Sequence, residues 1–291
     1  PPPAPPPPRP RRPPPAPPPP PAPPGWALRP AEPFDERRTD QISGAAGIGT
    51  GRLLLADRAR AAGHDALAQR HLAVALACAR DLLTDRPEES AEAPIAGTAG
   101  LAVGFAHGRA GLAHFLLALP DAEAAAGARG LVEALAADTP RLIAEAGRPA
   151  ATRRYGSWCR GLAGIGTVLV QAGRHYGEEA LVTLADRTAQ ACRAMAPRMG
   201  LVVQCCGLAG VGELLVDLAV ATGDERHWHA AEEIAGLILT RSGGPVGAPL
   251  LPGGNLVAES AGWAIGTPGV LSFLRRLHRR GGPRPAMLFQ G

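Results

Sequence analysis

The sequence predicts an all-α protein in which pairs of helices repeat, forming either an α-solenoid or a closed α/α toroid. The motif Gly-x-x-Gly occurs five times ahead of an apolar segment with helical spacing. Its first glycines are Gly44, Gly108, Gly161, Gly207 and Gly266. The steps of 64, 53, 46 and 59 residues between them each leave room for two helices. Aromatic residues make up only 4% of the chain, which favours helices over a β-sandwich.

The second helix of each pair is visible as a stretch of apolar residues at helical spacing. We expect these helices at residues 64–83, 121–137, 179–195 and 225–239. Asp224 precedes the last stretch and is a suitable N-cap. Together with the helices that follow the glycine motifs, the pattern indicates an incomplete barrel of about five helix pairs.

The glycine motifs have a physical role, because glycine lets a loop turn sharply into a helix and lets neighbouring backbones pack closely. In a toroid the loops gather at one end of the inner helices. Side chains that are 50–100 residues apart in sequence then converge in space. We number the loops from one to five; they span residues 40–44, 104–108, 156–161, 203–207 and 263–266.

Composition divides the chain into a Pro/Arg-rich disordered tail at residues 1–38 and a helical domain at residues 39–291. The tail fits a passive linker, or a polyproline segment that binds SH3-like partners. The net charge is +4, and the tail arginines contribute much of it. The helical domain therefore lacks the basic face that binding of nucleic acid needs.

No apolar run approaches the ~20 residues of a membrane span, and the best candidate, Leu162–Val170, is short. The start of the chain has no signal-peptide pattern. The five cysteines of the whole chain are too few and too irregularly placed for a disulfide framework. We therefore expect a cytoplasmic protein.

Three cysteines lie just before the first glycine of their motifs: Cys159 in loop three, and Cys205 and Cys206 in loop four. If the loops converge, three thiolates can bind zinc and leave a fourth position for an exchangeable ligand, as in catalytic zinc sites. A thiol in that position becomes a thiolate nucleophile. The alternative is that these cysteines are inert. Cys78 and Cys192 lie within second helices and are expected in the core.

His107 directly precedes the first glycine of loop two, on the same expected rim as the cysteines. It is either a proton donor near neutral pH or a capping or core histidine. His114 is expected to be structural. His227 and His229 are two residues apart on a helix and do not share a face, so they are not expected to bind metal. Asp40 is an acid near the rim or an N-cap.

These residues resemble the LanC-like lanthionine cyclases, a family of zinc enzymes with an α/α toroid of seven helix pairs. The resemblance covers about residues 40–276. The matching motifs, in order, are Asp40-Gln41-Ile42-Ser43-Gly44, Ala106-His107-Gly108, Trp158-Cys159-Arg160-Gly161, Cys205-Cys206-Gly207 and Gly266-Thr267-Pro268-Gly269.

The resemblance implies a role for each matching position. Cys159 and Cys205 match the two cysteine ligands of the family, and Cys206 stands where most members have a histidine ligand. A subgroup with Cys-Cys-Gly uses three thiolates there. His107 matches the proton donor, and Asp40 matches an acid held near it.

The family also has an arginine a few residues before the Trp-Cys pair. Arg154 and Arg153 are the candidates, although Tyr155 fits the usual spacing better. Arg160 stands where some members place Tyr or His.

The implied reaction is a conjugate addition within a dehydrated precursor peptide. A cysteine thiolate held on Zn²⁺ adds to dehydroalanine or dehydrobutyrine, and His107 protonates the enolate to complete a thioether ring. The implied partners are that peptide and a dehydratase domain or protein.

The chain departs from the family in having about five helix pairs rather than seven. Three explanations are open: a fragment of a larger protein, a misplaced start, or a short member that dimerises or has lost activity. A catalytically impaired, peptide-binding module is therefore the alternative function. Another α/α-toroid enzyme, a glycosidase or terpene cyclase, is disfavoured because the loops carry cysteines rather than paired carboxylates.

Overall fold

The computed structural model describes residues 39–283 except residues 43, 85–102, 149–150, 152, 246, 248 and 253–260. Within these ranges every regular element is a helix, and an isolated bridge between Gly243 and Leu250 is the one instance of β pairing. The all-α prediction is therefore confirmed. The α-helices are α1 (Ala45–Ala61), α2 (Asp65–Thr84), α3 (Arg109–Leu117), α4 (Ala122–Ala146), α5 (Leu162–Tyr176), α6 (Glu179–Met195), α7 (Leu208–Thr222), α8 (Glu225–Thr240) and α9 (Thr267–His278), and the 3-10 helices are η2 (Arg153–Gly156) and η3 (Ala196–Arg198).

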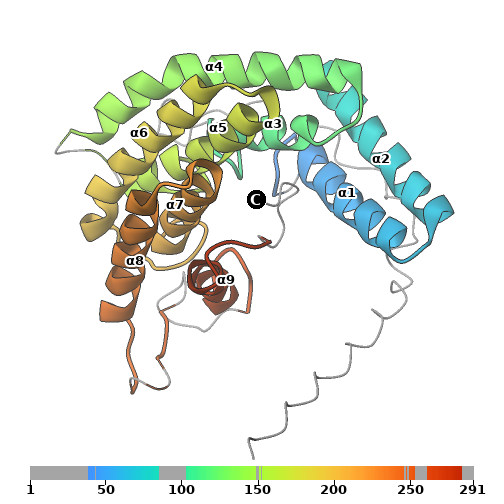
Figure 1. Ribbon diagram of the computed structural model, residues 1–291. Helices are drawn as coiled ribbons and strands as arrows, with labels where there is room; N and C mark the ends of the chain where they lie inside the picture. Colours follow the sequence, from blue (N-terminus) through green and yellow to red (C-terminus); the bar gives the residue numbers. More distant parts are fainter. Residues whose placement is uncertain are drawn as a thin grey trace, which may run out of the picture. The chain divides into compact units, whose positions relative to one another are not determined.

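The helices form pairs and two layers. Each odd-numbered helix from α1 to α7 packs beside the even-numbered helix that follows it (Figure 1). The odd-numbered helices also contact one another in chain order from α1 to α9, as do α2, α4 and α6. Helices α5 and α7 are buried on nearly all sides, whereas α6 and α8 each bury one stripe. The odd-numbered helices are therefore the inner layer and the amphipathic even-numbered helices the outer one.

The predicted second helices agree with α2, α6 and α8 to within one residue at each end. Asp224 caps α8 as expected, since its carboxylate accepts a hydrogen bond from the Arg226 backbone N–H at 2.9 Å. The prediction for α4 was wrong at its C-terminal end, because the helix continues through Pro140 to Ala146. Its buried stripe also continues, through Leu142 and Ala146. Packing of that stripe outweighs the one backbone hydrogen bond that proline cannot donate.

The second glycine of each motif explains why the motif recurs. A Cβ at this position would lie 2.0–2.4 Å from a backbone carbonyl oxygen in the loop just before it, in all five motifs. At Gly210 the oxygen is that of Gln204, at 2.4 Å, and the Trp158 Cβ of loop three is 2.9 Å away. Any residue larger than glycine would push the inner helix away from its own loop and from the preceding one.

Some expectations concern residues outside the described ranges, namely the tail at 1–38, Ser43 of loop one and residues 284–291. Within the described ranges α9 is the last helix, and it packs against α7 and α8. No helix in these ranges is both long and apolar enough to cross a membrane, and Leu162–Val170 is part of the buried inner helix α5.

Candidate metal centre

Backbone hydrogen bonds hold neighbouring loops in a common register. The Ala106 N–H of loop two donates to the Cys159 carbonyl of loop three at 2.9 Å. In turn, the Cys159 N–H donates to the Cys205 carbonyl at 3.0 Å, and the Cys205 N–H to the Ala264 carbonyl of loop five at 2.8 Å. Loop one joins this ladder through the Gln41 N–H, which donates to the Ala106 carbonyl at 3.1 Å. The loops therefore converge as the repeat predicted.

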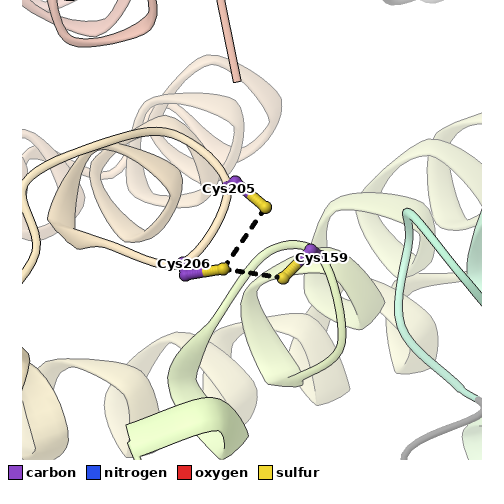
Figure 2. A group of neighbouring side chains, drawn as sticks. All are labelled: Cys159, Cys205 and Cys206. Carbon is purple, nitrogen blue, oxygen red and sulfur yellow. Dashed lines mark hydrogen bonds between the residues drawn. The ribbon is translucent and has the colours of Figure 1, made fainter. Parts of the chain in front are cut away.

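The three loop cysteines come together at this edge (Figure 2). The Cys159 Sγ is 3.2 Å from the Cys206 Sγ, which is 3.3 Å from the Cys205 Sγ. All three sulfur atoms lie within 4.8 Å of one another. Cys159 is buried, Cys205 is half-buried and Cys206 is exposed. The cluster is therefore closed on the side of loop three and open to solvent at Cys206.

The thiols of the cluster change one another's acidity. Hydrogen bonds from the Cys205 and Cys206 thiols lower the pKa of Cys159 to about 3, and the charge of Arg160 acts in the same direction. Because the Cys159 thiolate accepts these bonds, the pKa of Cys206 rises to about 11 and that of Cys205 rises as well. The cluster therefore makes the Cys159 thiol more acidic and the two thiols of loop four less acidic.

The donor set fits zinc. In a tetrahedral site with Zn–S bonds of about 2.3 Å, the sulfur ligands are about 3.8 Å apart. The observed separations of 3.2 and 3.3 Å differ from this by about half an ångström, which small side-chain rotations can supply. Thiolate is a soft ligand that zinc favours. Three ligands with an exposed side at Cys206 leave a fourth position that an external thiol can reach.

His107 and Asp40 form a pair on loops two and one. The His107 Nδ1 lies 3.0 Å from the Asp40 Oδ2, and both side chains are largely buried. A carboxylate can only accept, so Nδ1 carries a proton and Nε2 is the atom left for other chemistry. Neither residue caps a helix, since α1 and α3 begin after Gly44 and Gly108 with no side-chain cap. The other Asp40 oxygen accepts from the Ile42 N–H at 2.9 Å.

Of the arginine candidates, Arg154 is near enough to the cysteine cluster for its charge to act on Cys206. Its side chain is exposed, and its charge acts to lower the pKa of Cys206. The Tyr155 hydroxyl donates instead to the Glu145 Oε2 on α4 at 2.9 Å, away from the thiols. The side chain of Arg153 lies outside the described part of the structure.

Ser157 is a residue of this site that the sequence analysis missed. Its hydroxyl donates to the Arg154 carbonyl at 2.7 Å and accepts from the Arg160 N–H at 3.3 Å. The Cys159 Sγ is 3.7 Å from the same oxygen. Ser157 thereby fixes the turn that presents Cys159. A serine two residues before a loop cysteine was the only signal for it.

Polar groups without partners lie directly behind the cysteine loops. Gln204 is 0% exposed, and neither atom of its amide has a hydrogen-bond partner in the described structure. The indole N–H groups of Trp158 and Trp263 are also buried without partners, and these two rings meet edge to face. Trp158 and Gln204 immediately precede Cys159 and Cys205. Nothing in the residue pattern indicated these groups.

The other cysteines and three of the histidines lie apart from the cluster. Cys192 is fully buried in α6, and Cys78 is half-buried in α2. His114 is buried beside Gln171, with the ring Nδ1 2.8 Å from the amide oxygen. His227 pairs with Asp186 through Nε2 at 2.8 Å, and the exposed His229 is near Glu232. In the described residues the only group of three or more potential metal ligands is the cysteine cluster.

The fold and the site together define a protein of paired helices with a three-cysteine cluster that could hold a metal ion at the loops of its inner layer. Residues 27–280 match the family described as lanthionine synthetase C-like protein, and the chain belongs to that family. The fold of the family is an α/α toroid, which accounts for the two alternating layers. No curated protein sequence matches the chain.

Proposed function

We propose that this chain is a zinc-dependent lanthionine cyclase acting on a dehydrated precursor peptide. The observation that carries the proposal is the three-thiol cluster, open on one side, on the same loop ladder as the His107–Asp40 pair. The product is a thioether between a peptide cysteine and a former dehydroalanine or dehydrobutyrine. Dehydrated residues imply a dehydratase, on this chain's natural protein or on a separate one.

Cys159, Cys205 and Cys206 are the residues that would hold the zinc ion. When bound, zinc makes the thiol of the peptide acidic enough to react as a thiolate at neutral pH. Cys159 is anchored by its backbone bond to Cys205 and by Ser157, so hydrogen bonds join the two cysteine loops. The exposed side of Cys206 is where the peptide would enter.

His107 is the proton donor in this proposal. Addition of sulfur to the β-carbon leaves an enolate, which must gain a proton at the α-carbon. The Asp40 carboxylate holds the Nδ1–H of His107 and stabilises the imidazolium, so that Nε2 can deliver its proton. Arg154 is exposed beside Cys206, and we propose that it binds the peptide near the reacting groups.

Zinc content separates this proposal from the alternative of a peptide-binding module. We expect about one zinc per purified chain, with strong loss in Cys159→Ser and Cys206→Ser. Cys78→Ser is the matched control, because Cys78 is a half-buried cysteine on α2 outside the cluster. A folded wild-type protein that holds no zinc would favour the binding module.

Cyclisation is the direct test. Ring closure leaves the mass of the peptide unchanged, so we would follow the loss of peptide thiols that can be alkylated. His107→Ala should retain zinc but cyclise about 10²–10⁴-fold more slowly. A wild-type protein that binds zinc and peptide but closes no ring would refute the proposed activity.

A further inference from the structure

Arg160 occupies the position between the proposed proton donor and the metal cluster. The ladder aligns Ala106, Cys159 and Cys205 on three successive loops, so the residues that follow them are also aligned. These residues are His107, Arg160 and Cys206. Arg160 therefore shares the loop position of two residues that the proposed reaction uses, and it lies on the loop between theirs.

The guanidinium of Arg160 makes no hydrogen bond or ion pair with a carboxylate among the described residues. In the described part of the chain, six arginines are buried or half-buried. Five of them have side-chain partners. Arg52 contacts His71, Arg109 contacts Asp138, and Arg129 contacts Glu133 and Glu178. Arg241 binds backbone carbonyls, and Arg276 pairs with Glu213 and Asp217. Arg160 is the sixth. Within the described residues its backbone N–H donates to Ser157, and its side chain acts on Cys159 through its charge but makes no hydrogen bond.

An arginine removed in part from water ordinarily gains a carboxylate, a carbonyl or an aromatic ring in exchange for lost hydration. Among the described residues no carboxylate, carbonyl or ring bonds the Arg160 guanidinium, and its nitrogens are not among the buried polar atoms that lack a partner. The side chain therefore has donors available to a bound peptide beside the cysteine cluster. The strongest partner for a guanidinium is an oxygen that accepts hydrogen bonds and carries or develops negative charge.

We propose that Arg160 binds the carbonyl oxygen of the dehydrated residue and stabilises the enolate that forms there. This inference rests on the proposed cyclase function. As the sulfur–Cβ bond forms, the Cα=Cβ π bond breaks and its electron pair moves onto the carbonyl oxygen beside Arg160. A proton from His107 then reaches Cα, the oxygen becomes a carbonyl again, and the net change is addition of S–H across the double bond.

The order of residues along the ladder suits this assignment. The reacting sulfur belongs at the cysteine cluster, where it bonds to Cβ, and His107 protonates Cα. The carbonyl oxygen is on the carbon next to Cα, so a donor on the loop between the cluster and His107 is suitably placed to reach it. A preorganised cationic donor at a developing oxyanion is among the largest single contributions to catalysis. If Arg160 only balanced the charge of the thiolates, its loss would change the acidity of the cysteines but would not favour one charge of reagent over another.

The first test measures anion binding at Arg160 without zinc or peptide. In the metal-free full chain we would alkylate Cys206, the exposed cysteine, with iodoacetate and with iodoacetamide, and locate the adducts by peptide mapping. These reagents share their reaction but differ in charge, so the ratio of their rates cancels changes in thiol acidity. We expect the ratio of the iodoacetate rate to the iodoacetamide rate to fall about three- to tenfold in Arg160→Gln. Arg174→Gln, which removes an exposed arginine at the end of α5, is the control and should leave the ratio unchanged.

The second test is turnover of the zinc-loaded protein. We expect Arg160→Gln to keep its zinc and its KM for the dehydrated peptide but to lose about 10²–10³-fold in kcat. Arg160→Lys should recover part of the loss, because lysine retains the charge without the planar pair of donors. An alkylation ratio equal in the wild type and Arg160→Gln would overturn the proposal, and so would an unchanged kcat.

These outcomes are distinguishable from failure of the proposed function. If the wild type closes no ring yet its alkylation ratio depends on Arg160, the cyclase assignment fails together with the enolate role, and an anion site remains. If rings form normally and the ratio is insensitive to Arg160, the cyclase assignment stands and Arg160 is not its oxyanion donor.

Discussion

Gly210→Ala is the change that most directly tests how the fold builds the site. Gly210 is the second glycine of the fourth motif, in the first turn of α7. An alanine Cβ there would be 2.4 Å from the Gln204 carbonyl oxygen and 2.9 Å from the Trp158 Cβ. Both of these residues directly precede cysteines of the cluster, so the substitution presses on both cysteine loops at once.

The expected cost follows from the overlap. Ordinary contact begins near 3.4 Å, so the Gln204 carbonyl and α7 must separate by about 1 Å. Overpacking of this kind costs about 1–3 kcal/mol. The displacement also strains the neighbouring 2.8 Å bond from the Cys205 N–H to Ala264, worth about 1 kcal/mol. Alanine returns up to about 1 kcal/mol of helix propensity, which leaves a net loss of about 1–3 kcal/mol.

The assay is thermal unfolding of the metal-free chain, followed by titration with zinc against a competing chelator. We expect a lower Tm, by about 3–10 °C for a chain of this size, and a zinc affinity reduced about 10- to 100-fold. The control is Gly236→Ala in α8, where a Cβ meets nothing within 4 Å. It should raise stability by about 0.5–1 kcal/mol and leave zinc affinity unchanged. Equal behaviour of the two variants would refute the close-approach argument.

Three further predictions concern the site. Zinc binding must remove protons from the two thiols of loop four, whose pKa values are raised, but not from Cys159, whose pKa is about 3. The logarithm of zinc affinity should therefore rise by about two per pH unit between pH 6.5 and 8.5; a slope near three in chelator competition would mean that Cys159 is also protonated. Asp40→Asn should leave zinc content unchanged but slow cyclisation about 10²–10⁴-fold, because an amide does not hold the Nδ1–H of His107 as a carboxylate does; a wild-type rate in the thiol-loss assay would exclude this positioning role. Gln204→Met removes two buried polar atoms that have no partner and should stabilise the chain by about 1–2 kcal/mol in urea unfolding; a loss of stability would show that the amide is hydrogen-bonded through ordered water.

The sequence alone determined the helical class, most helix boundaries and the convergence of the cysteine loops. Apolar periodicity reports which face of a helix is buried, and this is a local property of the chain. The phase of the glycine motif then converts sequence position into spatial position, because every repeat places its loop in the same way. For this reason Cys159, Cys205 and Cys206 could be predicted to meet, although helices α5 and α6 lie between Cys159 and Cys205 in the sequence.

The sequence was less informative where a long-range contact competed with a local rule. Pro140 is a helix breaker by local rules, yet α4 continues because Leu142 and Ala146 are buried beyond it. The packing partners of that stripe lie on other helices, and residue spacing within α4 does not reveal them.

Only the tertiary structure decided which polar groups have partners. Gln204 looks like an ordinary loop residue in the sequence, and Tyr155 fits the spacing of the family's arginine better than Arg154 does. In the folded chain, Tyr155 bonds to Glu145 on α4. Among the described residues the Arg160 guanidinium and the Gln204 amide make no hydrogen bond. Whether a group is satisfied depends on side chains that other repeats bring to it, and only the packing of the loops determines those neighbours.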